Sequence, residues 1–474
     1  MSQDHAPAAL PLGTWPPPVR DMPVSATLAA NEATAARQGR GQPVLPLGFG
    51  EAGLPVHPAL QRALATATAA NGYGPVAGQE VLRSAVAGYW TRRGLPTGPG
   101  QVVCGPGSKP LLFGLLLALG ADVALPSPSW VSYAAQAAII GARAHLVPTT
   151  AGEGGFPDPA ALDAAATAAA AAGRPIRSVV VTLPDNPTGR LASPATVRAL
   201  CQVAEAHGLV IICDEIYRDL VHDPAASVLS PAEVAPQHTV VTTGLSKSLA
   251  LGGWRIGAAR MPAGPLGHQL RQALLGVGSE IWSAPAAPVQ HAAVLAFTEP
   301  PAITARIAAS RSLHGTIARA AASVCTAAGL TVPPPQAAFY LYPDFEPWRD
   351  HLRAQHKVTT GAALARLLLD RYGAAALPAS AFGESPAALR LRLATGLLYG
   401  DSEEQRSAAL AVANPLTLPW IAAALARLQE ILTDLASSAL QHVQGRAPAN
   451  RPTAATHPTA TGSSCHLGSS IKFR

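Results

Sequence analysis

Short apolar runs alternate with longer segments of helical periodicity through the middle of the chain. Seven of these runs are predicted to be strands: 101–104, 122–125, 144–147, 178–183, 209–213, 239–243 and 256–260. The strongest runs are apolar at consecutive positions, as expected for strands that are buried on both faces of a parallel sheet. Helical patterns such as 193–207 and the alanine-rich 160–172 separate them. We therefore predict an α/β fold with a mainly parallel sheet, in which ligands bind beyond the carboxyl ends of the strands.

The pattern and the local composition divide the chain into five segments. A second α+β region follows the predicted sheet, with strands expected at 338–341 and 389–394 and a last helix at 421–435. The connection 396–419 has no role that the pattern explains. The predicted segments are a mostly irregular Pro/Ala-rich arm (1–40), the N-terminal part of a small domain (41–70), a large domain (71–286), the small C-terminal domain (287–438) and a disordered tail (439–474).

Composition and charge exclude several classes of function. The formal net charge is +6, but residues 439–474 alone hold four basic residues and no acidic one, and the body has no basic stripe, so nucleic-acid binding is not expected. No apolar run has the length of a membrane span, and no signal sequence precedes the first helix, so we expect a cytoplasmic protein without a membrane partner. The five cysteines lack metal-ligand spacing, which predicts reduced thiols and no metal site.

Lysine is rare in this chain, which allows each lysine to be considered in turn. The four lysines are Lys109, Lys247, Lys357 and Lys472. Lys247 directly follows the predicted strand 239–243 and therefore lies where a ligand pocket belongs. A Schiff base requires an amine that can lose its proton inside a pocket, which arginine cannot provide. Taken alone, a lysine at a strand end is also compatible with a structural role.

The neighbours of Lys247 carry a stronger signal. The segment Thr243-Gly-Leu-Ser-Lys247 with Arg255-Ile-Gly257 resembles the lysine segment of the class I/II aminotransferases, which are fold-type I enzymes dependent on pyridoxal phosphate (PLP). The resemblance continues in order over roughly 45–394. It includes Leu47-Gly-Phe-Gly-Glu51, Tyr73-Gly-Pro-Val-Ala-Gly78, Gly105-Pro-Gly-Ser-Lys109, Pro128-Ser-Trp130, Asp185-Asn-Pro-Thr-Gly189, Asp214-Glu-Ile-Tyr217, Phe339-Tyr340 and Arg390-Leu-Arg-Leu-Ala394.

The resemblance implies a binding site for the cofactor phosphate. Gly107, Ser108 and Lys109 open a predicted helix, whose free N–H groups suit an anion. Ser246 and Arg255 are expected to complete this site. The family often has a serine three residues before the lysine, whereas this chain has Gly244, so one phosphate hydroxyl is missing.

The remaining cofactor contacts follow from the same resemblance. Asp214 is expected to hold the proton on the ring nitrogen, which lets the ring accept electrons from the substrate Cα. Asn186 and Tyr217 are expected at the phenolic oxygen, and Trp130 is expected to stack on the ring. Tyr73 is expected to reach the phosphate in a partner subunit, which implies a homodimer.

The substrate carboxylate requires a separate cation. The resemblance places an arginine at Arg390, with Gly50 and Asn186 as further contacts, and the spacing to Ala394 favours Arg390 over Arg392. Arg392 lies on the same strand face and competes for this role. Catalysis is assigned to Lys247, Asp214 and Tyr217, with Lys247 moving the Cα proton.

These residues predict an aminotransferase that moves an amino group from an amino acid to a 2-oxo acid. The same site could serve another PLP-dependent Cα reaction: β-elimination (C–S lyase), decarboxylation or oxidation. A non-catalytic aminotransferase-like regulator is less favoured, because about forty residues precede the domain and a winged helix needs more. Ser279, followed by Glu280, stands where aspartate-type relatives have an arginine that the partner subunit supplies for a side-chain carboxylate, so we expect a preference for neutral donors over aspartate.

Overall fold

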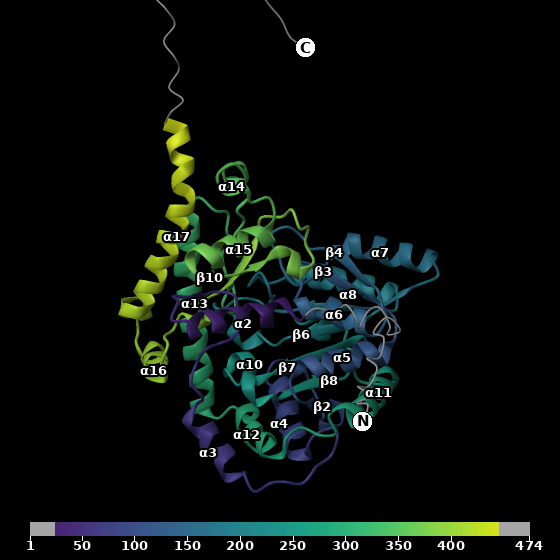
Figure 1. The fold of residues 1–474 in the computed structure, drawn as a ribbon. Coiled ribbons are helices and arrows are strands. Elements are labelled where there is room, and N and C mark those ends of the chain that lie inside the picture. The colour runs from purple at the N-terminus through teal and green to yellow at the C-terminus, as the bar shows by residue number, and fades with distance from the viewer. Residues whose placement is uncertain (1–23, 445–474) are drawn as a thin grey trace, which may run out of the picture.

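The computed structural model describes the backbone of residues 24–444 and is built around a seven-stranded sheet (Figure 1). Each predicted strand of the sheet is present within two residues of its expected ends. The strands are β2 (Val102–Gly105), β3 (Asp122–Ser127), β4 (Ala144–Pro148), β5 (Ile176–Thr182), β6 (Val210–Asp214), β7 (Thr239–Gly244) and β8 (Gly257–Arg260).

The topology of this sheet brings three polar strand ends together. The strand order is β2-β8-β7-β6-β5-β3-β4, and only β8 runs antiparallel to its neighbours. In the register, Asp214 is paired with Thr182 of β5 on one side and with Thr242 of β7 on the other. The carboxyl ends of β5, β6 and β7 therefore form one edge with Asp214 at its centre.

Helices cover both faces of the sheet, and consecutive residues of a strand pack against helices on opposite faces. Val103 packs on the side of α5, α6 and α11, whereas Val102 packs on the side of α4 and α12. Ile211 and Ile212 divide in the same way between α7–α8 and α5–α6. The helices of this part are α4 (Glu80–Thr91), α5 (Ser108–Leu119), α6 (Val131–Ile139), α7 (Pro159–Ala171), α8 (Pro194–Ala206), α9 (Pro231–Val234), α10 (Leu245–Ser248), α11 (Pro265–Ile281) and α12 (Ala287–Thr298), with α3 (Pro58–Thr66) packed against α12.

The second part combines a long helix with small sheets around a leucine-rich core. Its three-stranded sheet has the order β11-β12-β9, and β1 pairs with β10. The elements are α13 (Pro301–Ala327), α14 (Arg349–His356), α15 (Gly361–Tyr372), α16 (Glu403–Ala411), α17 (Pro419–Gln444), β1 (Leu45–Pro46), β9 (Tyr340–Leu341), β10 (Ala374–Ala375), β11 (Leu377–Pro378) and β12 (Leu391–Ala394).

Three segments differ from the sequence prediction. Within the predicted irregular arm, α2 (Ala26–Gly39) is a helix preceded by Ser25, and its alanine-rich composition favours that state. The unexplained connection 396–419 contains α16, whose N-cap Ser402 accepts a hydrogen bond from the Gln405 N–H. The last helix, α17, runs nine residues beyond 435 and extends away from the body in Figure 1. Residues 439–444 of the predicted disordered tail are therefore helical, and residues 1–23 and 445–474 lie outside the described residues.

Several composition-based expectations can be compared with the described residues. Cys104, Cys201, Cys213 and Cys325 are buried free thiols, while Cys465 lies outside the described range. Between residues 24 and 444, no helix combines the length and the apolar character needed to cross a membrane.

Candidate active site

A cavity of about 510 Å³ lies beyond the carboxyl ends of β5, β6 and β7 and is closed on the other side by residues of the second part. Ten of the thirteen residues that the sequence suggests for the site line it: Gly50, Ser108, Lys109, Trp130, Asn186, Asp214, Tyr217, Ser246, Lys247 and Arg255. Gly107 lies directly beside it, against Arg255. Tyr73 and Arg390 are not part of its lining.

Lys247 is one of two half-buried lysines that line this cavity. It lies on α10, one turn after the end of β7, and its Nζ donates a hydrogen bond to the Gly50 carbonyl oxygen at 2.5 Å. Burial, reinforced by the Arg392 charge, lowers the pKa of Lys247 to about 8. The amine can therefore lose its proton near neutral pH.

Asp214 provides the negative charge at the base of the cavity. Its two carboxylate oxygens accept hydrogen bonds from Thr242 Oγ1 at 3.0 Å and from Tyr133 Oη at 3.1 Å. Burial raises the pKa of Asp214 to about 6. No cation forms an ion pair with Asp214 among residues 24–437, so a cationic ligand atom would be stabilised beside it.

The start of α5 and its neighbours form an anion-binding corner. Gly107, with φ +94°, precedes the helix, and a Cβ there would lie 2.5 Å from Arg255 Nη2. Gly257 packs so closely that its Cβ would be 2.6 Å from the Ser108 N atom. Ser108 at the start of α5, Ser246 and Arg255 all line this corner, where free helix N–H groups suit an anion.

The spacing within 390–394 favours Arg390 as the carboxylate ligand, and here the structure requires a correction. Arg390 forms ion pairs with Asp344 at 2.9 Å and Glu384 at 2.8 Å, and its side chain is 42% exposed. Arg392 instead lines the cavity, is buried, and donates hydrogen bonds to Asn186 Oδ1 and the Gly48 carbonyl oxygen. The two arginines share a strand face but lie about 7 Å apart along it, which places only Arg392 at the cavity.

Arg392 retains unused binding capacity. Its Nε has no hydrogen-bond partner although it is buried, and no carboxylate pairs with it among the described side chains. A buried guanidinium without a counter-ion is costly, by several kcal/mol in typical cases. A carboxylate ligand would offset this cost through a bidentate ion pair.

Other lining residues have no signal that the sequence makes obvious. Tyr340 and Tyr133 lie in the cavity wall, and their hydroxyls bond Tyr217 and Asp214 respectively. Tyr133 follows Trp130 by one helical turn, which could have indicated it. Ser25, Thr27 and Leu28 at the start of α2 form a further part of the wall, and the Ser25 N-cap before an alanine-rich run was the available signal.

Lys109 is a second amino group in the cavity. Its Nζ lies 5.0 Å from the centre of the Trp130 ring, and Trp130 in turn contacts Tyr133 edge-on. Burial and the charge of Arg255 lower the pKa of Lys109. No hydrogen bond or ion pair of Lys109 Nζ is present among the described side chains. A ring face and a cation are thus available to a ligand.

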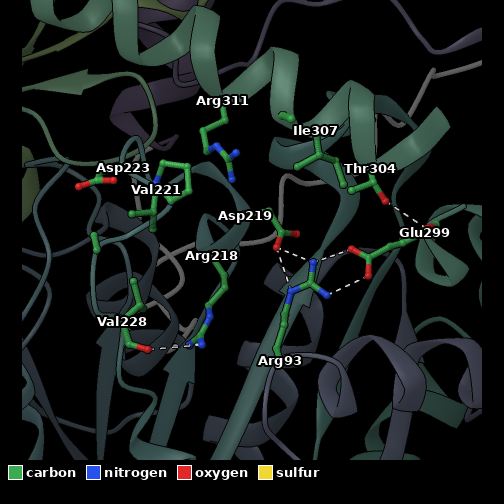
Figure 2. A pocket seen from close by; sticks show the side chains of 13 residues that line it. Arg93, Arg218, Asp219, Val221, Asp223, Val228, Glu299, Thr304, Ile307 and Arg311 are labelled. Carbon is green, nitrogen blue, oxygen red and sulfur yellow. Dashed lines mark hydrogen bonds and ion pairs between the residues drawn. The ribbon is translucent and has the colours of Figure 1, made fainter. Parts of the chain in front are cut away.

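A different cleft, of about 370 Å³, lies between α13 and the segment after β6 (Figure 2). Three of its charged side chains are engaged with one another, since Arg93 pairs with Asp219 at 2.7 Å and with Glu299 at 2.5 Å. No lysine lines it. The cavity around Lys247 is therefore the better candidate for the active site.

Comparisons with known proteins agree with this geometry. Residues 43–399 match the family described as aminotransferase class I and II. The chain is 32% identical over 387 residues to a probable aspartate/prephenate aminotransferase of Thermus aquaticus, covering 80% of this chain and 94% of that protein. It is also 32% identical over 390 residues to the aspartate aminotransferase of Geobacillus stearothermophilus, covering 80% and 94% of the two chains.

A solved structure shows the same fold. The aspartate aminotransferase of Thermus thermophilus, determined with maleate, superposes with a TM-score of 0.74 at 29% identity, and the match covers 87% of this chain and 98% of that one. The family match spans most of the chain and includes every residue that lines the cavity except those of α2 and Ser25. The chain therefore belongs to the class I and II aminotransferases.

Proposed function

We propose that this aminotransferase binds PLP through Lys247 and transfers the amino group of a dicarboxylic amino acid to a 2-oxo acid. The observation that carries the proposal is the convergence of Lys247, Asp214 and Arg392 on one cavity. PLP supplies an aldehyde that condenses with amines and a ring that accepts the electrons left on Cα. The family is PLP-dependent, and the donor set of the cavity fits this group.

The fit rests on charges that the chain leaves unbalanced. Asp214 is a buried carboxylate without a cationic partner, and it suits the protonated ring nitrogen. The α5 start with Ser246 and Arg255 suits the phosphate. Tyr217 and Asn186 are proposed to bond the phenolic oxygen, and Trp130 is proposed to cover the ring face.

Lys247 is proposed to act as the base and acid of the reaction. Because its pKa is lowered to about 8, a usable fraction of the amine is neutral at physiological pH. The neutral Lys247 amine would take the proton from the substrate Cα and would then return it to the aldehyde carbon that PLP supplies. In the structure the Lys247 amine is hydrogen-bonded to the Gly50 carbonyl oxygen and is near Arg392. It would therefore lie near a carboxylate bound by Arg392.

Arg392 is proposed to bind the α-carboxylate of the substrate. Its bonds to Asn186 and Gly48 fix the guanidinium, while the unpartnered Nε remains for the ligand. This fixed orientation would hold Cα within reach of Lys247 in every turnover.

Lys109 favours an acidic rather than a neutral donor. Once Arg255 serves a phosphate and Arg392 an α-carboxylate, Lys109 is a further cation in the cavity without a partner. A second carboxylate would satisfy it, with Ser25 and Thr27 as additional hydroxyl groups of the wall. The expectation of a neutral donor rests on Ser279 and Glu280 reaching the site from a partner subunit, whereas Lys109 belongs to the cavity of the same chain. The relatives are named for aspartate and prephenate, and one was solved with a dicarboxylate, maleate.

Steady-state assays test both parts of the proposal. The PLP-loaded protein is supplied with aspartate, glutamate, alanine or phenylalanine, with and without 2-oxoglutarate. We expect aspartate or glutamate to give the highest kcat/KM and the new 2-oxo acid to form only with an acceptor. Product formed without an acceptor would indicate elimination, decarboxylation or oxidation instead.

A lysine substitution identifies the residue responsible for the donor preference. We expect Lys109→Gln to lower kcat/KM for the acidic donor by about 10- to 100-fold, as the loss of a charged hydrogen bond implies, and to change the value for alanine little. Lys357→Gln, at an exposed position, is the matched control and should leave both values unchanged. An equal loss for acidic and neutral donors would place Lys109 at the cofactor phosphate.

We also propose a homodimer. Tyr73 is 85% exposed in the single chain, which is unusual for an aromatic residue and agrees with its covering by a partner subunit. In that arrangement its hydroxyl would reach the partner's phosphate site.

A further inference from the structure

Tyr340 lies at the meeting point of three parts of the active site. It begins β9, is fully buried and lines the cavity with its ring. Its hydroxyl is 2.7 Å from the Tyr217 hydroxyl, and the two rings meet edge-on with centroids 5.5 Å apart. Among residues 24–437, Tyr340 is the hydrogen-bond partner of the Tyr217 hydroxyl.

The lack of a side chain at Gly50 leaves room for the Tyr340 hydroxyl. A Cβ on Gly50 would lie 2.6 Å from the Tyr340 oxygen, so a side chain at position 50 would displace it. The Gly50 carbonyl is also the acceptor for Lys247. On the other side, the Arg392 guanidinium carbon lies 5.0 Å from the centre of the Tyr340 ring, within cation–π range.

We infer that Tyr340 is a positioning residue that holds the Tyr217 hydroxyl in place and supports Arg392 through its ring face. The inference rests on the proposed function, in which Tyr217 donates a hydrogen bond to the phenolic oxygen of PLP. A hydroxyl has one proton, so while Tyr217 donates it to the phenolic oxygen, Tyr340 must be the donor in the bond between the two tyrosines. Hydrogen bonds in such a chain strengthen one another, and Tyr340 therefore makes Tyr217 a better donor.

This chain of hydroxyls has a spectroscopic consequence. A hydrogen bond to the phenolic oxygen stabilises its negative charge and weakens its hold on the nearby Schiff-base proton. Losing the Tyr340 hydroxyl should therefore raise the pKa of the chromophore formed with Lys247. The other charged groups that face Lys247 are retained in a Tyr340 variant: Arg392, Glu51, Arg255 and Asp214.

The test is a pH titration of the absorbance of PLP-loaded Tyr340→Phe. We expect the apparent pKa of the chromophore to rise by about 0.5 to 1 relative to the unsubstituted protein, the size expected for one hydrogen bond. Because phenylalanine keeps the ring, the contact with Arg392 is retained and KM for the donor should change less than about threefold. An unchanged chromophore pKa would overturn the inference.

Tyr342→Phe is the matched control. Tyr342 is also buried and loses one hydrogen bond, to Glu384, but that bond lies outside the cavity lining. It should leave the chromophore pKa unchanged, and an equal rise in both variants would contradict a specific role for Tyr340. If the unsubstituted protein formed no titrating chromophore with PLP, the proposed function itself would fail.

Discussion

Arg390 and Arg392 lie two residues apart on one strand face, yet their surroundings differ. Asp344 and Glu384 neutralise Arg390 at a half-exposed position. Arg392 is buried among aromatic rings, with Tyr340 and Phe382 each about 5 Å from its guanidinium carbon. The unpaired arginine is the one able to bind a carboxylate.

This contrast predicts different outcomes for two otherwise equal substitutions. Arg392→Ala should lower kcat/KM for the amino donor by at least about 100-fold, because a charged bidentate contact is lost. Arg390→Ala should keep near-normal kinetics and lower the free energy of unfolding by about 1 kcal/mol or less, as for other surface ion pairs. Steady-state kinetics and thermal unfolding of both variants give the comparison. A large kinetic loss in Arg390→Ala alone would restore the assignment to Arg390.

The sequence could predict a site residue when its position in the site depends only on the strand to which it belongs. Asp214 ends β6 and Lys247 follows the end of β7 by three residues, and the strand pattern alone places them at the ligand edge. The spacing favoured Arg390 over Arg392, and this choice was wrong because it depends on Asp344 and Glu384, which other segments bring to Arg390. The hydrogen bond between Tyr217 and Tyr340 could not be predicted either, because distant segments of the chain bring the two residues together.

At the level of elements, the pattern located the seven strands of the main sheet because both of their faces are buried. It did not locate β1, β10 or β11, which have two residues each and exist through pairing with distant strands. It also missed α2, a helix with no fully buried residue and hence little amphipathic signal. Because α2 forms part of the cavity wall, Ser25 and Thr27 were missed with it.

The packing of β8 against the start of α5 gives a prediction for the anion corner. In Gly257→Ala, the new methyl group would lie 2.6 Å from the backbone of Gly107 and Ser108, so these N–H groups must move. We expect the Kd for PLP to rise at least about tenfold, with destabilisation of about 1 to 3 kcal/mol as for other overpacked sites.

Gly276→Ala on α11 serves as the control, because no atom lies within 4 Å of the added Cβ. It should bind PLP normally and be as stable as the parent or slightly more so, since alanine favours helix. Cofactor titration by fluorescence and thermal unfolding would measure both variants. Normal PLP affinity in Gly257→Ala would show that the corner does not hold the cofactor.

For the whole molecule, the proposed homodimer leads to a prediction of where its contact lies. Tyr73, Val81 and Ile281 are each more than half exposed, and the loop before α4 packs against the end of α11 through Val76 and Gly278. Exposed apolar residues gathered in this way are typical of an interface. We place the dimer contact there.

Light scattering tests the assembly. The PLP-loaded protein should have twice the chain mass of 48.3 kDa, and Ile281→Arg should shift it toward the monomer with loss of activity. Val412→Arg, at an exposed position of the second part, should remain dimeric and active. A fully active monomer would refute a site that needs Tyr73 from the partner.

The identity of the lysine that binds PLP tests the central claim most directly. The PLP-loaded protein is reduced with borohydride and digested, and the modified peptide is identified by mass spectrometry. We predict a single adduct on Lys247, absent from a folded Lys247→Ala variant, because Lys247 lines the cavity and its pKa is lowered to about 8. An adduct on Lys109, or one that persists in Lys247→Ala, would contradict the account.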